Sequence, residues 1–217
     1  MYKGIAGSEG IGIGKAVLIE EHEINVEAKK VTDMDGEIAR LQKAIEKFVA
    51  DTTEMAARMD ETVGKKDADI LRGHIQMLQD PMLEEQISAL MLNEKITAEM
   101  AVDQVLEQTA EMFAQIPDEL LQQRATDFRD IKTRMLKILM GIEDVDISQV
   151  PSGTVLVARD LTPSMTAGIN PDNIAGILTE VGGRTSHSAI LARAMEIPAV
   201  LSIENICSIV KNGDEVV

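Results

Sequence analysis

The sequence predicts a mixed fold: an α/β domain assembled from both ends of the chain, with an all-α helical-bundle domain inserted into it. Glycine and β-branched residues concentrate at the two ends, whereas the middle has few glycines and carries apolar residues at helical spacing. Because the two ends share a composition that the middle lacks, we expect the α/β domain in residues 1–21 and 144–217. The helical domain is expected in residues 22–143.

The first 20 residues, MYKGIAGSEGIGIGKAVLIE, predict two short strands joined by a glycine-rich turn. Helical periodicity follows, with apolar residues three and four positions apart, as at Ile38, Leu41 and Ile45. Thr32, three residues before Asp35, is a candidate cap for the first helix. Gly64 and the Asp80–Pro81 step predict breaks, so we expect three to five helices in two long hairpins.

Strand patterns return after the helical region, at residues 153–158, 173–179 and 199–202, with short helical segments between them. Near the end, the Asn212–Gly213 turn predicts one more strand in the final residues, GDEVV. Because the chain stops where that strand would begin, we expect it to be a fragment of a longer protein.

Charge and composition narrow the possible functions. The chain carries 37 acidic and 21 basic side chains, for a formal net charge of −16. Nucleic acids and anionic membranes select clustered Lys and Arg, so the charge argues against both and suits a basic protein partner. The single cysteine, Cys207, cannot form an internal disulfide, and no apolar run approaches the ~18 residues of a membrane span, which predicts a cytoplasmic protein.

The stretch GGRTSHSAILARAMEIPAV, residues 182–200, follows a predicted strand and opens a helix near Ser186 or His187. Glycines let backbone amides approach a ligand closely, and the first turn of a helix favours an anion. A histidine placed there is kept neutral, hence nucleophilic, and the helix dipole stabilises a phosphoryl group attached to it. The candidate site consists of the phosphoryl acceptor His187, the cation Arg184, and the phosphate-loop residues Gly182, Gly183, Thr185 and Ser186.

Simpler interpretations of the same residues remain open. Serine and threonine at a helix start are commonly only caps, and a lone histidine there can be incidental. The segment DLTPSMT predicts a helix start with Thr162 as cap and Pro163 in the first turn, which leaves the direction of Thr166 undecided. Three histidines scattered along the sequence do not indicate a metal site.

Residues 182–200 resemble the phosphohistidine signature of the phosphoenolpyruvate-dependent phosphotransferases, a family that includes enzyme I of the bacterial sugar phosphotransferase system, pyruvate phosphate dikinase and phosphoenolpyruvate synthase. Three further stretches, MYKGIAGSEGIGIGKA, GHIQMLQDPMLEEQI and RATDFRDIKTRML, are similar to enzyme I. Dikinases and synthases lack this helical insertion. The resemblance covers essentially the whole chain, and it implies a swivelling α/β phosphohistidine domain, discontinuous in sequence, with an inserted helical domain that binds the phosphocarrier HPr.

The resemblance also implies roles for single residues. His187 matches the histidine that is phosphorylated on its ε nitrogen, and Thr166 matches the threonine that holds the other ring nitrogen. Arg184 matches the arginine expected at the phosphate. HPr contacts are implied on the first two helical hairpins, at His74, Asp80, Leu83, Glu84 and Arg124. The sequence departs from the family pattern at Lys65 and Lys66, where an acidic pair is expected.

In enzyme I, phosphoenolpyruvate and Mg²⁺ bind to a C-terminal barrel that this chain lacks, so the resemblance implies no metal or cofactor here. We therefore expect this fragment only to exchange phosphoryl groups with HPr, and to be monomeric where the full-length enzyme is a homodimer. Two alternatives stay open. One is an enzyme I-like segment of a nitrogen-related or dihydroxyacetone phosphotransfer protein, and the other is a non-catalytic docking module.

Overall fold

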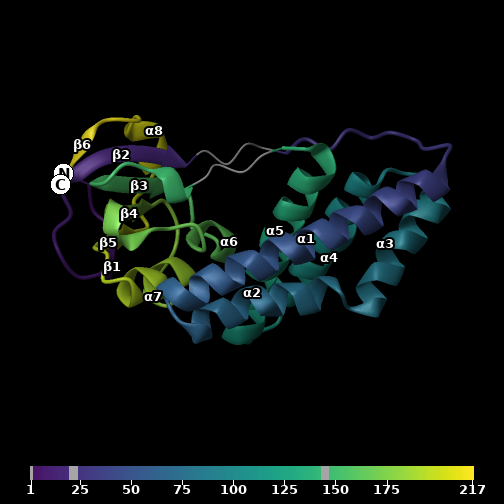
Figure 1. The fold of residues 1–217 in the computed structure, drawn as a ribbon, viewed down its shortest axis with the longest axis horizontal. Coiled ribbons are helices and arrows are strands. Elements are labelled where there is room, and N and C mark those ends of the chain that lie inside the picture. Colours follow the sequence, from purple (N-terminus) through teal and green to yellow (C-terminus); the bar gives the residue numbers. More distant parts are fainter. Residues whose placement is uncertain (1, 20–23, 143–146) are drawn as a thin grey trace. The chain divides into compact units, whose positions relative to one another are not determined.

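The computed structural model describes residues 2–19, 24–142 and 147–217, and its helices and strands are labelled in Figure 1. The chain divides into two compact units, one comprising residues 1–22, 58–68 and 145–217 and the other residues 23–57 and 69–144. The domain boundaries expected between residues 21 and 22 and between residues 143 and 144 lie outside the described residues. Each unit is considered separately below.

A six-stranded mixed sheet forms the first unit, with strand order β1-β5-β4-β3-β2-β6. Its strands are β1 (Ile5–Ser8), β2 (Gly14–Ile19), β3 (Thr154–Ala158), β4 (Ile174–Thr179), β5 (Ala199–Leu201) and β6 (Glu215–Val216). The four strands β2 to β5 pair in parallel, while β1 and β6 pair antiparallel to their neighbours. Sequence segments from both ends of the chain thus share one sheet, as predicted, and the predicted last strand forms as β6.

The two N-terminal strands form where the sequence predicts them, but they are not neighbours. Three strands lie between β1 and β2 in the sheet, so the glycine-rich connection crosses the sheet instead of making a hairpin. Gly12 lies against β4 in this crossing, where a Cβ atom would be 2.2 Å from the carbonyl oxygen of Ala175. Only a residue without a side chain allows that approach.

Both faces of the sheet are covered by helices, as Figure 1 shows for α7 (His187–Ala194) and α8 (Ile206–Ile209). The core on the α7 side includes Leu156 and Ala189, and a smaller cluster on the α8 side includes Val157. Strand β3 is buried along its whole length, as expected for a parallel strand covered on both faces. Cys207 is half-buried beside the smaller cluster.

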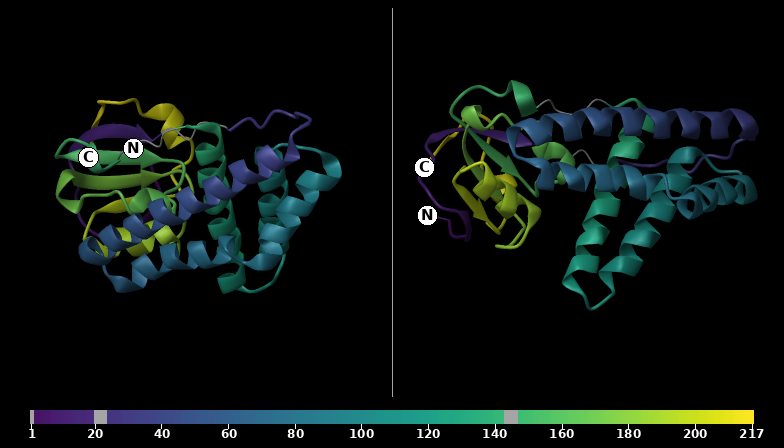
Figure 2. Two further views of the ribbon diagram at one scale, coloured as in Figure 1. Left: turned by 45° about the vertical axis from the view of Figure 1, so that its right-hand side comes forward. Right: turned by 60° about the horizontal axis from the view of Figure 1, so that its bottom comes forward.

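Five helices build the helical region, at the upper end of the predicted number. They are α1 (Met34–Thr62), α2 (Lys65–Leu78), α3 (Pro81–Glu94), α4 (Ala98–Ala114) and α5 (Glu119–Met140). Helices α4 and α5 make the most extensive helix pair and form a hairpin that is clear in the right-hand view of Figure 2. The apolar core of the second unit includes Phe48, Leu106 and Ile131.

The helix breaks follow the sequence signals closely. Gly64 separates α1 from α2 with a φ of +136°, which glycine adopts without strain. Asp80 caps α3 by accepting a hydrogen bond from the Met82 amide, and Pro81 occupies the first turn. The cap expected at Thr32 is wrong by one residue. Asp33 takes that place, since its carboxylate accepts a hydrogen bond from the Gly36 amide at 3.0 Å.

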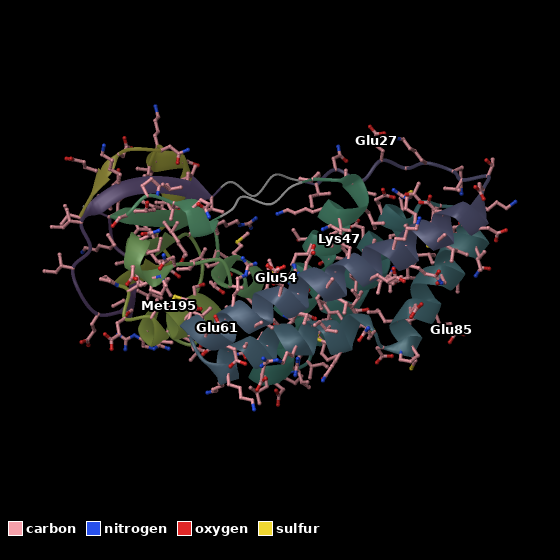
Figure 3. All side chains as sticks on the ribbon, in the orientation of Figure 1. Glu27, Lys47, Glu54, Glu61, Glu85 and Met195 are labelled. Atoms are coloured by element: carbon pink, nitrogen blue, oxygen red, sulfur yellow. The ribbon has the colours of Figure 1, made fainter. Side chains whose placement is uncertain are left out.

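Acidic side chains such as Glu54 and Glu85 project from the exposed helix faces (Figure 3). Among the described residues, no helix combines the length and hydrophobicity needed to cross a membrane.

A partly buried ion pair joins α1 to α4. Both carboxylate oxygens of Glu99 accept hydrogen bonds from the two terminal nitrogens of Arg40, and Glu37 accepts a third at 2.7 Å. Burial acts to raise the pKa of Glu99, but the hydrogen bonds and charge of Arg40 outweigh it and lower this pKa below 4.5. The pair therefore stabilises the fold only while Glu99 is ionised.

We expect Glu99→Gln to weaken the acid sensitivity of the fold. A carboxylate with a lowered folded pKa adds stability that is complete above its unfolded pKa of 4.5 and is lost as the pH falls through the folded pKa. Urea unfolding between about pH 3 and about pH 7 measures the effect. Glu85→Gln, at an exposed position of α3, is the matched control, and an equal pH slope in both variants would contradict the assignment.

Candidate functional site

The predicted strand–loop–helix unit is present in the first unit. Strand β4 ends at Thr179, a loop covers residues 180–186, and α7 begins at His187. Ser186 is the N-cap, and its hydroxyl accepts a hydrogen bond from the Ala189 amide at 3.3 Å. His187 is therefore the first residue of the helix, at the end where the helix dipole is positive.

Thr166 and His187 lie side by side. Thr166 ends the short helix α6 (Pro163–Thr166), which Thr162 caps as the sequence predicts. The Thr166 side chain is buried, and its hydroxyl lies 3.5 Å from Nε2 of His187. The tertiary structure thus answers the question that local sequence left open, because Thr166 faces the helix that carries the imidazole.

The ring nitrogen beside Thr166 differs from the expected one. We expected the threonine at the nitrogen that does not carry the phosphoryl group, but it faces Nε2. The hydroxyl donates to the carbonyl oxygens of Pro163 at 2.8 Å and Thr162 at 3.1 Å, so it presents a lone pair to the imidazole. This arrangement suits a ring protonated on Nε2. At 3.5 Å this single interaction is weak.

All four consecutive carbonyl oxygens of residues 181–184 accept hydrogen bonds from the protein. Val181 accepts from the Thr179 hydroxyl at 2.6 Å, and Gly182 accepts from the Ser202 hydroxyl. The carbonyl of Gly183 accepts from the Ser186 amide at 3.0 Å, and that of Arg184 accepts from the Arg193 guanidinium at 3.0 Å. Hydrogen bonds to these four carbonyl oxygens hold the loop along its length.

The amide groups of the same loop, unlike its carbonyls, are not engaged by the described part of the protein. In a trans peptide the N–H and the carbonyl of the same peptide group point in opposite directions. Because the carbonyls of residues 181–184 are held by hydrogen bonds to the protein, the amides of residues 182–185 point away from those donors. None of these four amides has a hydrogen-bond partner within the described part of the chain. Gly182 has a φ of +109°, which a side chain would disfavour. The loop thus offers donors to an external anion.

Asp160 and Ser188 belong to the same site, although the sequence patterns did not single them out. Asp160 follows β3, and its carboxylate accepts hydrogen bonds from the Ser188 hydroxyl and the Leu161 amide, both at 2.8 Å. Burial raises the pKa of Asp160 despite these hydrogen bonds. The contact joins the segment leading to Thr166 with the first turn of α7, and only the fold brings the two together.

Arg184 lines an open groove of about 510 Å³ beside the loop. The other lining residues are Ala6, Gly7, Ser8, Glu9, Arg193 and Glu196. Arg184 and Thr185 are exposed, and the described contacts include none between Arg184 and His187. The cation expected at the phosphate therefore lies in the groove in this state.

The residues predicted to contact HPr divide into exposed and buried ones. Asp80, Glu84 and Arg124 are exposed, whereas His74 and Leu83 are buried. Leu83 belongs to the apolar core of the second unit. A buried side chain offers no surface to a partner, so only the exposed three remain candidates for direct contact.

Asp127 connects two of these positions, a role that the sequence patterns did not indicate. Its carboxylate lies 3.4 Å from Nε2 of His74 on α2 and 3.5 Å from the guanidinium of Arg124 on α5. Asp130 lies 3.8 Å from the other ring nitrogen of His74. His74 is thus enclosed by two carboxylates of α5, which makes it a link between helices.

No metal centre accompanies these sites in the part of the chain that the structure describes, where no group of three or more His, Cys, Asp and Glu side chains could hold an ion.

Comparison with known families agrees with the signature in the loop. Residues 3–124 match the family described as PEP-utilising enzyme, N-terminal, and residues 150–217 match its mobile domain. This chain belongs to the PEP-utilising enzymes. The site residues Thr166, Arg184 and His187 all lie in the segment that matches the mobile domain.

Several curated relatives carry the name phosphoenolpyruvate-protein phosphotransferase. The chain is 38% identical over 212 residues to the phosphoenolpyruvate-protein phosphotransferase of Mycoplasma capricolum, and 37% identical over 216 residues to that of Haemophilus influenzae. These matches cover 98% and 99% of this chain but only 37% and 38% of the relatives. The chain therefore corresponds to a little over a third of their length.

Solved structures give the same family relationship. The chain is 39% identical to an enzyme I structure determined in solution, with a TM-score of 0.84 and coverage of 99% of this chain and 88% of the other. A second structure, described as the N-terminal domain of Enzyme 1 - Nitrogen, is 25% identical with a TM-score of 0.66, and it is covered to 93%. The predicted similarity to the N-terminal part of enzyme I is confirmed.

Proposed function

We propose that this chain is the N-terminal part of a phosphoenolpyruvate-protein phosphotransferase, and that it relays a phosphoryl group through His187 to the phosphocarrier HPr in sugar uptake. The observation that carries the proposal is the loop before α7, in which the carbonyls of residues 181–184 all accept hydrogen bonds while the amides of residues 182–185 are available beside His187. That arrangement suits a phosphoryl group, which is anionic and has three oxygens to place.

In the transfer from phospho-HPr, the bond between phosphorus and the HPr imidazole breaks as a bond to His187 forms. The accepting nitrogen needs its lone pair, and the helix N-terminus keeps the imidazole neutral before attack and stabilises the dianion afterwards. The reverse reaction uses the same atoms. Because both ends of the transfer are histidines of similar chemistry, positioning and positive electrostatics supply the catalysis.

The ε nitrogen is the acceptor that the family resemblance implies. Since Nε2 faces Thr166 at 3.5 Å, the imidazole must turn before that nitrogen can reach phosphorus. We propose that the proton then resides on Nδ1 and that Thr166 accepts it as a hydrogen bond, which would leave the Nε2 lone pair free to attack. Arg184 would turn from the groove toward the phosphoryl oxygens in the same step.

The helical domain is proposed to dock HPr through the exposed residues Asp80, Glu84 and Arg124. The α/β domain would then swivel between HPr and a C-terminal barrel that holds phosphoenolpyruvate and Mg²⁺ in the complete enzyme. This chain by itself would be a monomer, whereas the complete enzyme would be a homodimer. A cytoplasmic location is part of the same proposal.

A nitrogen-related relay is the second candidate, and the 25% identical structure supports it. The similarity to enzyme I is higher in both identity and TM-score, which favours the sugar system. A dihydroxyacetone phosphotransfer protein or a non-catalytic docking module would fit less well with the relatives named above, which are phosphoenolpyruvate-protein phosphotransferases and enzyme I structures.

Transfer from phospho-HPr tests the proposed function. The chain is incubated with phospho-HPr from the sugar system or with the corresponding nitrogen-related carrier, and acid-labile phosphate on the chain is measured. We expect faster labelling by phospho-HPr, and no labelling by phosphoenolpyruvate with Mg²⁺ alone. Absence of label from either carrier would refute the relay, and faster labelling by the nitrogen-related carrier would select the second candidate.

A Thr166→Val variant should accept the phosphoryl group more slowly. Valine matches the shape of threonine but lacks the hydroxyl beside Nε2, so the imidazole loses its hydrogen-bonded guide. We expect the rate to fall about tenfold, which corresponds to about 1.4 kcal/mol in the barrier. Rapid-quench measurement of transfer gives the rate. Thr166→Ser keeps the hydroxyl and is the control, and equal rates for both variants would show that the hydroxyl has no part in the reaction.

A further inference from the structure

Arg193 joins two segments that are distant from each other in the sequence. It lies in the last turn of α7, and its guanidinium donates one hydrogen bond to the carbonyl of Gly7 in β1 at 2.8 Å and another to the carbonyl of Arg184 at 3.0 Å. Resting on the proposed function, we infer that Arg193 is a positioning residue for phosphoryl transfer, because it holds the loop in the conformation that directs its amides toward an anion.

The carbonyl of Arg184 is the last of the four that the protein fastens. Holding it against Arg193 fixes the plane of the following peptide, so the Thr185 amide points to the opposite side. The three preceding carbonyls are held by neutral donors, namely two hydroxyls and an amide. Arg193 makes the one charged contact in this series, and charge-assisted hydrogen bonds are stronger than neutral ones.

The two hydrogen bonds of Arg193, to the carbonyls of Gly7 and Arg184, form a bridge that requires a guanidinium. Its nitrogens form a rigid planar fork, so two carbonyls can be held in fixed relation to each other. A lysine ammonium carries the same charge but is a single point on a flexible stem. The positive charge also sits at the C-terminal end of α7, where the helix dipole favours it, and in a groove that includes Glu9 and Glu196.

The bridge ties the loop to a strand of the same unit. Gly7 is buried in β1, and a Cβ atom there would lie 2.9 Å from Leu201 of the neighbouring strand. The position of the loop is thus fixed relative to the sheet as well as to the helix that follows it. The two carbonyls that Arg193 binds belong to β1 and to the loop before α7, so its loss should slow transfer without weakening the binding of HPr.

Arg193→Lys and Arg193→Ala test the inference in single-turnover transfer from phospho-HPr. We expect the rate at saturating phospho-HPr to fall about 10- to 100-fold in both variants, the effect of misplacing a reacting group. The affinity for phospho-HPr should stay unchanged. Added guanidinium ion at about 10 mM, far below denaturing concentrations, should restore part of the rate of Arg193→Ala without raising its Tm. Lys211→Gln, which removes an exposed cation of the same unit, is the control for charge.

The outcomes separate the inference from the proposed function. If the unaltered protein takes no phosphate from phospho-HPr, the proposed function fails. If the unaltered protein is labelled and Arg193→Lys is labelled equally fast, the positioning role fails. It fails also if the rate loss in Arg193→Ala only follows the fraction of unfolded protein, measured by circular dichroism, and guanidinium has no effect.

Discussion

A His187→Ala variant will take up no acid-labile phosphate from phospho-HPr. His187 places its imidazole at the mouth of α7, next to Thr166 and the loop amides, so removing the imidazole removes the proposed acceptor. We expect a loss of at least about 10⁴-fold, in the range seen when the nucleophile of a covalent mechanism is deleted. Transfer of labelled phosphate, followed by gel autoradiography under alkaline conditions, measures it.

The fold should survive this change, because His187 is only half-buried and the cap at Ser186 remains. Circular dichroism and the thermal unfolding midpoint provide that check. His22→Ala is the matched control, as it also removes one of the three histidines, and it should be labelled normally. Label on His187→Ala with the same acid lability would assign the acceptor to a different residue.

A Gly14→Val variant will strongly lower the free energy of unfolding, because the substitution disturbs the sheet. Gly14 begins β2, and any Cβ atom there would lie 2.0 Å from the carbonyl oxygen of Gly153. That oxygen accepts the Lys15 amide, so it cannot move away without breaking the pairing of β2 with β3. We expect a loss of about 3 kcal/mol or more in the free energy of unfolding, the upper end for overpacking.

Gly183→Val is the comparison for that prediction. A Cβ atom at Gly183 meets nothing within 4 Å, and its φ is not in the positive region. We expect a change within about 0.5 kcal/mol, as at ordinary surface positions. Urea unfolding of both variants gives the difference, and equal midpoints would mean that the sheet adjusts at Gly14 by a route that the backbone geometry does not suggest.

Local signals in the sequence predicted much of the helical architecture. The break at Gly64, the cap at Asp80 with Pro81 behind it, and the cap at Ser186 all depend on backbone conformation and on hydrogen bonds within four residues. Such features are encoded nearby, so a single sequence is enough to place them. The cap predicted at Thr32 shows the limit, because Asp33 next to it offers an equivalent acceptor.

The order of the strands could not be obtained in the same way. The sequence predicted β1 and β2 as elements, but their separation by three strands depends on which partners each strand finds across the chain. Pairing of β1 with β5 joins residues almost 200 positions apart. The close approach of Gly12 to Ala175 follows from that topology.

The sequence by itself determined the family, the helix start at His187 and the glycine-rich loop before it, because these lie in one continuous stretch. Only the tertiary structure decided that Thr166 faces Nε2, that Arg193 fastens the loop, and that His74 is enclosed by carboxylates. The physical reason is one of distance along the chain. Caps and turns form between neighbours in sequence, whereas the contacts that orient an imidazole and a row of amides are made between segments that meet only after the sheet and the helices have packed.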